Sequence, residues 1–151
     1  MIDDRKVIYL AKLKKFEKNQ FVVAKEYNTY VSPEFILKEI KILLQLKHEN
    51  IINYIGSNIY RDRIILFYNY MPNQKFKDFY LDLDLDKIIT YFRNLFSALD
   101  FIHWKGIIHC DIKPENFICN IREKSYKLID FENSAELPNS SMEKHLWIYS
   151  P

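Results

Sequence analysis

The apolar positions in the first seventy residues fall into short runs that are typical of strands. Residues 7–14 and 21–27 are apolar or alternating, and the polar residues 17–20 separate them, so this pattern predicts a β-hairpin. Residues 51–55 and 63–70 predict two more strands around a polar turn. The N-terminal part of the chain is therefore expected to be rich in strands.

Two other segments carry apolar residues at helical spacing. Ser32 is placed to cap the first helix, with Pro33 and Glu34 in its first turn. Three aspartates within residues 82–86 precede the second, longer helix, which is expected to end at Gly106. The apolar stripes are Phe35, Ile36, Ile40, Leu43, Leu44 and Leu46 in the first helix, and Ile88, Ile89, Phe92, Leu95, Phe96, Leu99 and Ile102 in the second.

Composition limits the function classes that need to be considered. The chain has 151 residues, 48% of them hydrophobic, which suits one domain with its own core. The formal net charge of +2 does not favour a general electrostatic binder of nucleic acid. No apolar run is long enough to span a membrane, the first residues lack a signal-peptide pattern, and the two cysteines show neither disulfide nor metal spacing. We therefore expect a soluble protein of a reducing compartment that is not secreted.

The strongest chemical signal is the segment at residues 109–116, which reads His-Cys-Asp-Ile-Lys-Pro-Glu-Asn. It resembles the catalytic loop of eukaryotic protein kinases, in which His, Asp, Lys, Pro and Asn occupy the same offsets. The alternative is an accidental polar turn. Five matching residue types in eight positions argue against that alternative.

The resemblance implies a role for each polar residue of this loop and of a second segment downstream. Asp111 would orient the substrate hydroxyl and accept its proton, and Lys113 would neutralise charge on the transferred phosphate. Residues 128–132, Leu-Ile-Asp-Phe-Glu, resemble the metal-binding loop of the same family. Asn116 and Asp130 would then be the ligands of Mg²⁺. An ordinary turn aspartate is the alternative for Asp130, and its distance of nineteen positions from Asp111 favours the metal loop.

Upstream, residues 22–25, Val-Val-Ala-Lys, resemble the strand that carries the phosphate-binding lysine of protein kinases. Lys25 would contact the α- and β-phosphates of ATP, and Glu39 in the first helix would pair with it. The alternatives are an exposed strand lysine and a solvated helix acid. Asn69 and Met71 would belong to the hinge whose backbone binds adenine.

A narrower resemblance, to Ser/Thr kinases of the cell-division-control type, lies in residues 70–72, 76–80, 98–103 and 106–109. Such kinases act with an activator subunit on the replicative helicase to start DNA replication. The resemblance implies ATP and Mg²⁺ as cofactors, protein substrates such as helicase subunits, and an activator subunit as partner. It implies no direct contact with nucleic acid or membrane, and a nuclear location with the cytoplasm as alternative. A generic small kinase is the other interpretation.

The chain departs from the kinase pattern at several positions. Alignment places Met1, Asp3 and Lys6 where the family has the three glycines of its phosphate loop, so we expect weaker ATP binding. Cys110 replaces an arginine that usually receives an activation-loop phosphate. Glu132 replaces the glycine after Asp-Phe and adds a negative charge beside the predicted metal ligand.

The fold class that follows is α+β and protein-kinase-like, truncated at both ends. Residues of about 1–70 would form a strand-rich small lobe. Residues of about 71–151 would form the start of a helical large lobe, as far as the activation segment, and residues 72–74 would be the hinge. Two alternatives to an active Ser/Thr kinase stay open. One is a non-catalytic pseudokinase or partner-binding fragment, and the other is a decayed gene product without a stable fold.

Overall fold

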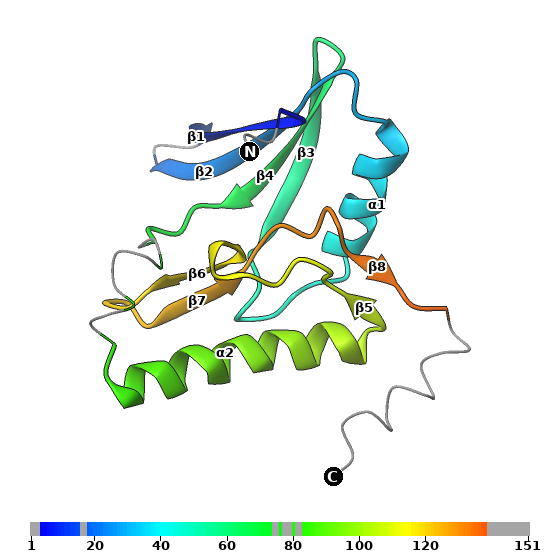
Figure 1. Cartoon of the computed structure of the whole chain (residues 1–151). Helices are drawn as coiled ribbons and strands as arrows, with labels where there is room; N and C mark the ends of the chain where they lie inside the picture. Colours follow the sequence, from blue (N-terminus) through cyan, green and yellow to red (C-terminus); the bar gives the residue numbers. More distant parts are fainter. Residues whose placement is uncertain (1–3, 16–17, 74–75, 77–79, 81–82, 139–151) are drawn as a thin grey trace.

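A four-stranded antiparallel sheet forms the N-terminal half of the described chain, in the order β1-β2-β4-β3 (Figure 1). The computed structural model describes residues 4–15, 18–73, 76, 80 and 83–138. The strands are β1 (Lys6–Lys15), β2 (Lys18–Tyr27), β3 (Tyr54–Tyr60) and β4 (Arg63–Asn69). The predicted hairpin is confirmed, but its predicted turn at residues 17–20 is wrong, because residues 18–20 pair with β1 as part of β2 and residue 17 lies outside the described residues. The strand predicted at residues 51–55 is wrong in its bounds, because Ile51 makes an isolated parallel bridge to Leu128 and β3 begins only at Tyr54.

Helix α1 (Pro33–Leu43) packs beside this sheet (Figure 1). Its predicted start is confirmed, because the Ser32 hydroxyl accepts a hydrogen bond from the amide of Phe35 at 3.3 Å. The predicted stripe extends too far. The helix ends at Leu43, the next turn tightens through i to i+3 hydrogen bonds, and Leu44 is 72% exposed. The buried face of α1 is Ile36, Glu39, Ile42 and Leu43.

Helix α2 (Leu85–Trp104) runs along the other side of the molecule (Figure 1). Asp84 caps it by accepting from the amide of Lys87 at 2.9 Å, and Gly106 follows its end with a φ of 70°, as expected for a C-terminal glycine. The buried face is Tyr91, Leu95, Ala98 and Ile102. The predicted stripe is therefore too broad, although Leu99 is partly buried and also packs against the core. The exposed members of the predicted stripe are Ile88, Ile89, Phe92 and Phe96.

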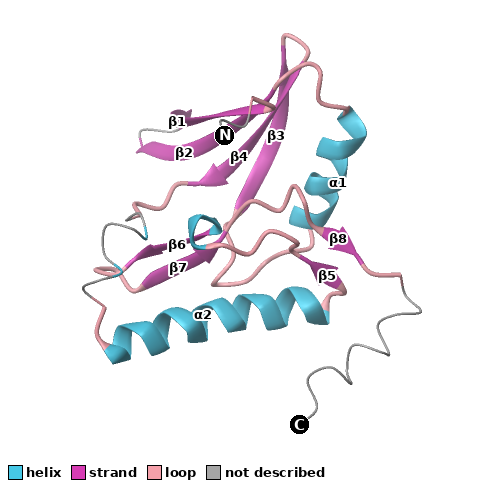
Figure 2. Cartoon of the chain, in the orientation of Figure 1, coloured by secondary structure: helices cyan, strands magenta, loops and turns pink. Residues whose placement is uncertain are grey.

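Several short elements follow α2 and lie between this helix and the rest of the fold (Figure 2). They are β5 (Ile107–Ile108), the 3₁₀ turn η3 (Pro114–Asn116), β6 (Phe117–Asn120), β7 (Ser125–Leu128) and β8 (Ala135–Glu136). The β6–β7 hairpin lies between the sheet and α2, and β5 pairs with β8. Strand β8 was not predicted. No helix in the described part of the chain is long and apolar enough to cross a membrane.

The end of β7 is bound to the connection between α1 and β3. The Leu128 amide donates to the carbonyl of Asn50 at 2.8 Å, and the Ile52 amide donates to the carbonyl of Leu128 at 3.0 Å. The side chain of Asn50 also donates to Asn94 of α2 at 2.7 Å. These bonds hold the segment that follows β7 against both halves of the fold, and this segment carries the predicted metal ligand Asp130.

Candidate active site

Six charged side chains meet where the start of β1, β2, α1 and the segment after β7 come together, and we call them the charge cluster. Three are basic and three are acidic. Two of the acids, Glu39 and Glu132, are almost fully buried, with exposed fractions of 1% and 3%. Charges at such depth are tolerated only when they are paired, so the contacts within the cluster decide its stability. The members are Arg5, Lys6, Lys25, Glu39, Asp130 and Glu132.

Lys25 is the centre of the charge cluster. Its ammonium lies 2.9 Å from Glu39 Oε1, 2.9 Å from Asp130 Oδ1 and 3.0 Å from Glu132 Oε2. Burial alone would lower the pKa of Lys25, but the three carboxylates outweigh it and raise that pKa above its usual value. The predicted strand lysine and helix acid are thus in contact, and the raised pKa favours the charged form of the lysine.

Glu39 is also bound by two tyrosines. Tyr27 donates its hydroxyl to Glu39 Oε2 at 2.5 Å, and Tyr68 donates to Oε1 at 3.3 Å. Burial and the negative charge of Glu39 raise the pKa of both tyrosines well above the usual value, so both stay protonated donors. Glu39 therefore accepts three hydrogen bonds in a dry environment. Such a network fixes the position of α1 relative to β2 and β4.

Lys6 and Arg5 complete the charge cluster from the start of β1. Lys6 Nζ lies 2.5 Å from Glu132 Oε2 and 3.0 Å from Asp130 Oδ2, and Arg5 Nη2 lies 2.9 Å from Glu132 Oε1. The sequence identifies Glu132 as an added negative charge but does not indicate these partners. Lys6 and Glu132 both stand where the kinase pattern has a glycine, and that comparison does not show that their side chains meet.

The predicted catalytic loop forms a second, more exposed group. Lys113 Nζ lies 2.7 Å from Asp111 Oδ2, and Asn116 Nδ2 donates to the same oxygen at 2.8 Å and to the Asp111 carbonyl at 2.9 Å. The hydrogen bond from Lys113 is the main cause that lowers the pKa of Asp111. Asp111 is therefore an ionised carboxylate, held by two neighbours in its own loop.

His109 connects this loop with the segment that carries Asp130. Its Nε2 donates to the carbonyl of Ile129 at 2.9 Å, its Nδ1 accepts from the amide of Asp111 at 3.3 Å, and its ring meets Phe131 edge-on at 4.8 Å. The two hydrogen bonds specify a neutral imidazole with its proton on Nε2. Burial lowers the pKa of His109 in agreement with that state. His109 is a positioning residue for Asp111.

The buried neutral His109 predicts a loss of stability in mild acid. Its pKa is lowered in the fold, so the unfolded chain binds a proton that the folded chain does not. The free energy of unfolding should therefore fall as pH decreases below about 6.5, the unfolded pKa of histidine. Urea unfolding at several pH values measures this, and His109→Gln should flatten the dependence. A full pH dependence in the variant would contradict this assignment.

A comparison with known protein families shows to which family the chain belongs. The family model described as "Protein kinase domain" matches residues 7–148. The chain belongs to the protein kinase family. The expected kinase-like α+β fold is thereby confirmed, and within this family the chain resembles Cdc7-like kinases.

Three relatives illustrate the resemblance to Cdc7-like kinases. The chain is 37% identical to the "Probable serine/threonine-protein kinase cdc7" of Dictyostelium discoideum over 111 residues, 73% of this chain. It is 34% identical to the "Cell cycle protein kinase spo4" of Schizosaccharomyces pombe over 76% of this chain. It is 40% identical to the human "Cell division cycle 7-related protein kinase" over 46% of this chain. The matches cover only 10%, 27% and 12% of these relatives.

The kinase family uses ATP together with a divalent metal ion, so we tested whether the predicted ligands fit such an ion. Asn116 and Asp130 offer amide and carboxylate oxygens, the atoms that Mg²⁺ prefers. Both carboxylate oxygens of Asp130 are bound by ammonium groups, however, and Lys6 alone lies 3.0 and 3.3 Å from them. An ion bound at about 2.1 Å from the same oxygens would lie against the Lys6 ammonium. As arranged, Asp130 does not fit a divalent ion, and the metal role of Asn116 and Asp130 stays a prediction.

The predicted adenine-binding residues lie at the end of β4 and just after it. The Asn69 amide donates to the carbonyl of Asn53 at 3.0 Å, so this amide is used by the fold. Met71 lies in the connection after β4, and its sulfur accepts a hydrogen bond from Ser125 of β7 at 3.0 Å. The hinge predicted at residues 72–74 has no helix or strand at residues 72 and 73, and Gln74 lies outside the described residues.

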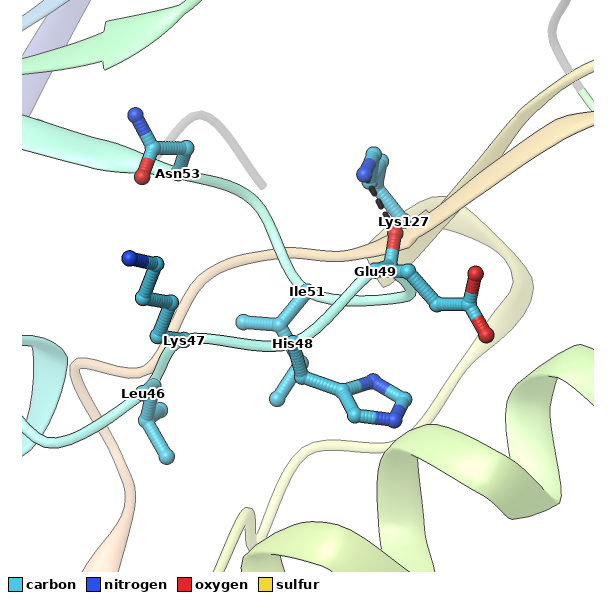
Figure 3. Close-up of a pocket in the computed structure, with 7 residues that line it drawn as sticks. All are labelled: Leu46, Lys47, His48, Glu49, Ile51, Asn53 and Lys127. Carbon is cyan, nitrogen blue, oxygen red and sulfur yellow. Dashed lines mark hydrogen bonds between the residues drawn. The ribbon is translucent and has the colours of Figure 1, made fainter.

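A pocket of about 300 Å³ lies in the connection between α1 and β3, and none of the predicted site residues lines it (Figure 3). His48 points toward α2 there and stacks on Phe101 at 4.8 Å. Lys127 donates to the carbonyl of Glu49 at its edge. The side chains of His48 and Lys127 are therefore engaged with the protein itself. The pocket is lined by Leu46, Lys47, His48, Glu49, Ile51, Asn53 and Lys127.

Proposed function

We propose that this chain is an ATP-dependent Ser/Thr protein kinase that transfers the γ-phosphate of ATP to hydroxyl groups of proteins. The observation that carries the proposal is the geometry of Asp111, a carboxylate held by both Lys113 and Asn116. The contact of Lys25 with Glu39 supports it, because this pair positions a cation for the phosphates in protein kinases.

The residues of the chain suit phosphoryl transfer, which depends mainly on positioning and charge neutralisation. Asp111 would orient the substrate hydroxyl and accept its proton while the hydroxyl oxygen forms a bond to the γ-phosphorus. The bond from the γ-phosphorus to the bridging oxygen of ADP breaks in the same step. Lys113 would stabilise the charge on the transferred group, and Lys25 would bind the phosphates that remain on the nucleotide.

The wider role that we propose is in the cell cycle and the initiation of DNA replication. It rests on the printed names of the relatives, "cdc7" and "Cell cycle protein kinase spo4". Subunits of the replicative helicase would be the substrates, an activator subunit the partner, and the nucleus the location. Residues of about 1–70 would act as the small lobe and residues of about 71–151 as the start of the large lobe.

A phosphate-transfer assay tests the reaction class. The chain is incubated with radiolabelled ATP, a divalent cation and peptides whose only acceptor is Ser, Thr or Tyr. Label is expected on the Ser and Thr peptides, because Lys113 follows the catalytic aspartate as in Ser/Thr kinases. Label on the Tyr peptide alone would contradict the acceptor class. Absence of transfer by a chain that melts cooperatively would contradict the proposal as a whole.

One observation favours a second candidate, a non-catalytic kinase-like module that binds a partner. Lys6 and Lys25 together bind both oxygens of Asp130, the residue that a kinase needs for its metal. A module of this kind would fold and would transfer no phosphate. Turnover that is abolished by Lys25→Met would reject this candidate.

A further inference from the structure

Lys6 presents a positive charge to the two acidic residues that follow β7. Its ammonium contacts both oxygens of Asp130, at 3.0 and 3.3 Å, and Glu132 at 2.5 Å. The side chain of Lys6 is 9% exposed, so its charge acts in a partly dry environment where electrostatic effects are strong. Lys25 reaches the same two acids from β2. Two ammonium groups thus converge on one pair of carboxylates.

The formal charges of the charge cluster can be summed with and without a divalent ion. Lys25, Glu39 and Asp130 in their ionised forms carry a net charge of −1, which a divalent ion would change to +1. Glu132 adds one negative charge, and Arg5 and Lys6 add two positive charges. The charges of these six described side chains therefore sum to zero without any metal ion. The side chains have removed the excess negative charge that would otherwise repel the phosphates of a nucleotide.

Lys6 and Glu132 are far apart in the sequence but in contact in the fold. They lie 126 residues apart, each stands where the kinase pattern has a glycine, and their side chains meet at 2.5 Å. A lysine ammonium is a compact point charge that binds phosphate as well as carboxylate. The paired replacement of two glycines therefore places a cation close to Lys25 and Asp130, in the region assigned to the nucleotide phosphates.

We propose that Lys6 is a nucleotide-binding residue whose ammonium takes the place of the divalent cation at Asp130, so that this site binds ATP free of metal. This inference rests on the proposed function in one respect, that ATP binds at the charge cluster. Glu132 holds Lys6 in place, and the ammonium groups of Lys6 and Lys25 would contact the phosphates. ATP in its fully ionised, uncomplexed form is the ligand class.

Binding of ATP to the unaltered 151-residue chain tests the inference directly. Isothermal titration calorimetry is run once with excess EDTA and once with excess MgCl₂. The Kd values are expected to differ by less than about tenfold, the change that 1.4 kcal/mol would produce. Binding only with MgCl₂ overturns the inference and leaves the proposed function in place. Binding under neither condition overturns both.

The variant Lys6→Met assigns the effect to Lys6. Loss of one charge-assisted contact should weaken ATP binding in EDTA by about tenfold or more, while binding with MgCl₂ is retained because Asp130 is relieved of one cation. Lys12→Met is the matched control, since Lys12 is an exposed lysine on the same strand, and it should change neither Kd. Unchanged binding of Lys6→Met in EDTA overturns the role of Lys6. If a variant does not fold, the comparison of ATP binding in EDTA and in MgCl₂ on the unaltered chain still tests the inference.

Discussion

Substitution Glu39→Ala is expected to lower the free energy of unfolding by about 3 to 5 kcal/mol, the cost of breaking a buried ion pair by removing one partner. The change removes the carboxylate that accepts from Lys25, Tyr27 and Tyr68, which are all buried. Both tyrosine hydroxyls would lose an acceptor in a dry environment, and each such loss is costly. Urea unfolding followed by circular dichroism measures the effect.

Two further variants show whether the loss of stability in Glu39→Ala comes from the lost carboxylate or from a general effect of substitution in α1. Glu39→Gln keeps an acceptor for the tyrosines and should cost less than Glu39→Ala, because Lys25 retains Asp130 and Glu132 as partners. Glu34→Ala is the matched control, since Glu34 is an exposed acid in the first turn of the same helix, and it should cost less than about 1 kcal/mol. A cost for Glu39→Ala as small as that of the control would contradict the network.

Substitution Asp111→Asn is expected to reduce phosphate transfer by about 10² to 10⁴-fold, the contribution of a positioned general base. Asn retains an oxygen that can accept from Lys113 and Asn116, so the loop should keep its shape. What is lost is the ability to accept the substrate proton. The measurement is the initial rate of label transfer from ATP to the Ser or Thr peptide.

Glu115→Gln is the matched control for this loss of activity. Glu115 is an exposed acid in η3, within the same loop, and none of the proposed steps uses it. Its substitution should leave the rate close to that of the unaltered chain. Undiminished transfer by Asp111→Asn would show that this carboxylate is not the base.

The parts of the site that could be predicted from the sequence are those that depend on local spacing. Residues 109–116 form one short continuous loop, so their spacing in the sequence is enough to bring Asp111, Lys113 and Asn116 together. Lys25 and Glu39 are separated by a single loop between a strand and the next helix. The contact between Lys25 and Glu39 could be inferred because the strand and the helix that carry them were both predicted from the sequence.

The parts that could not be predicted depend on contacts between distant segments. Nothing in the local pattern around Lys6 or Glu132 indicates a partner 126 positions away. Similarly, β3 begins later than the sequence predicts, because Ile51 pairs with the distant Leu128 and does not belong to β3. For α2, helical periodicity identifies apolar positions but not how wide a face its neighbours cover.

The hydrogen bonds between Leu128 and residues 50 and 52 have a consequence for the dynamics of the site. They lie two positions before Asp130 and attach it to the connection that leads into β3. A local opening at this point would release the segment that carries Asp130 from the connection into β3. Amide hydrogen exchange at Ile52 and Leu128 faster than exchange in β2 and α2 would show that this segment opens separately from global unfolding.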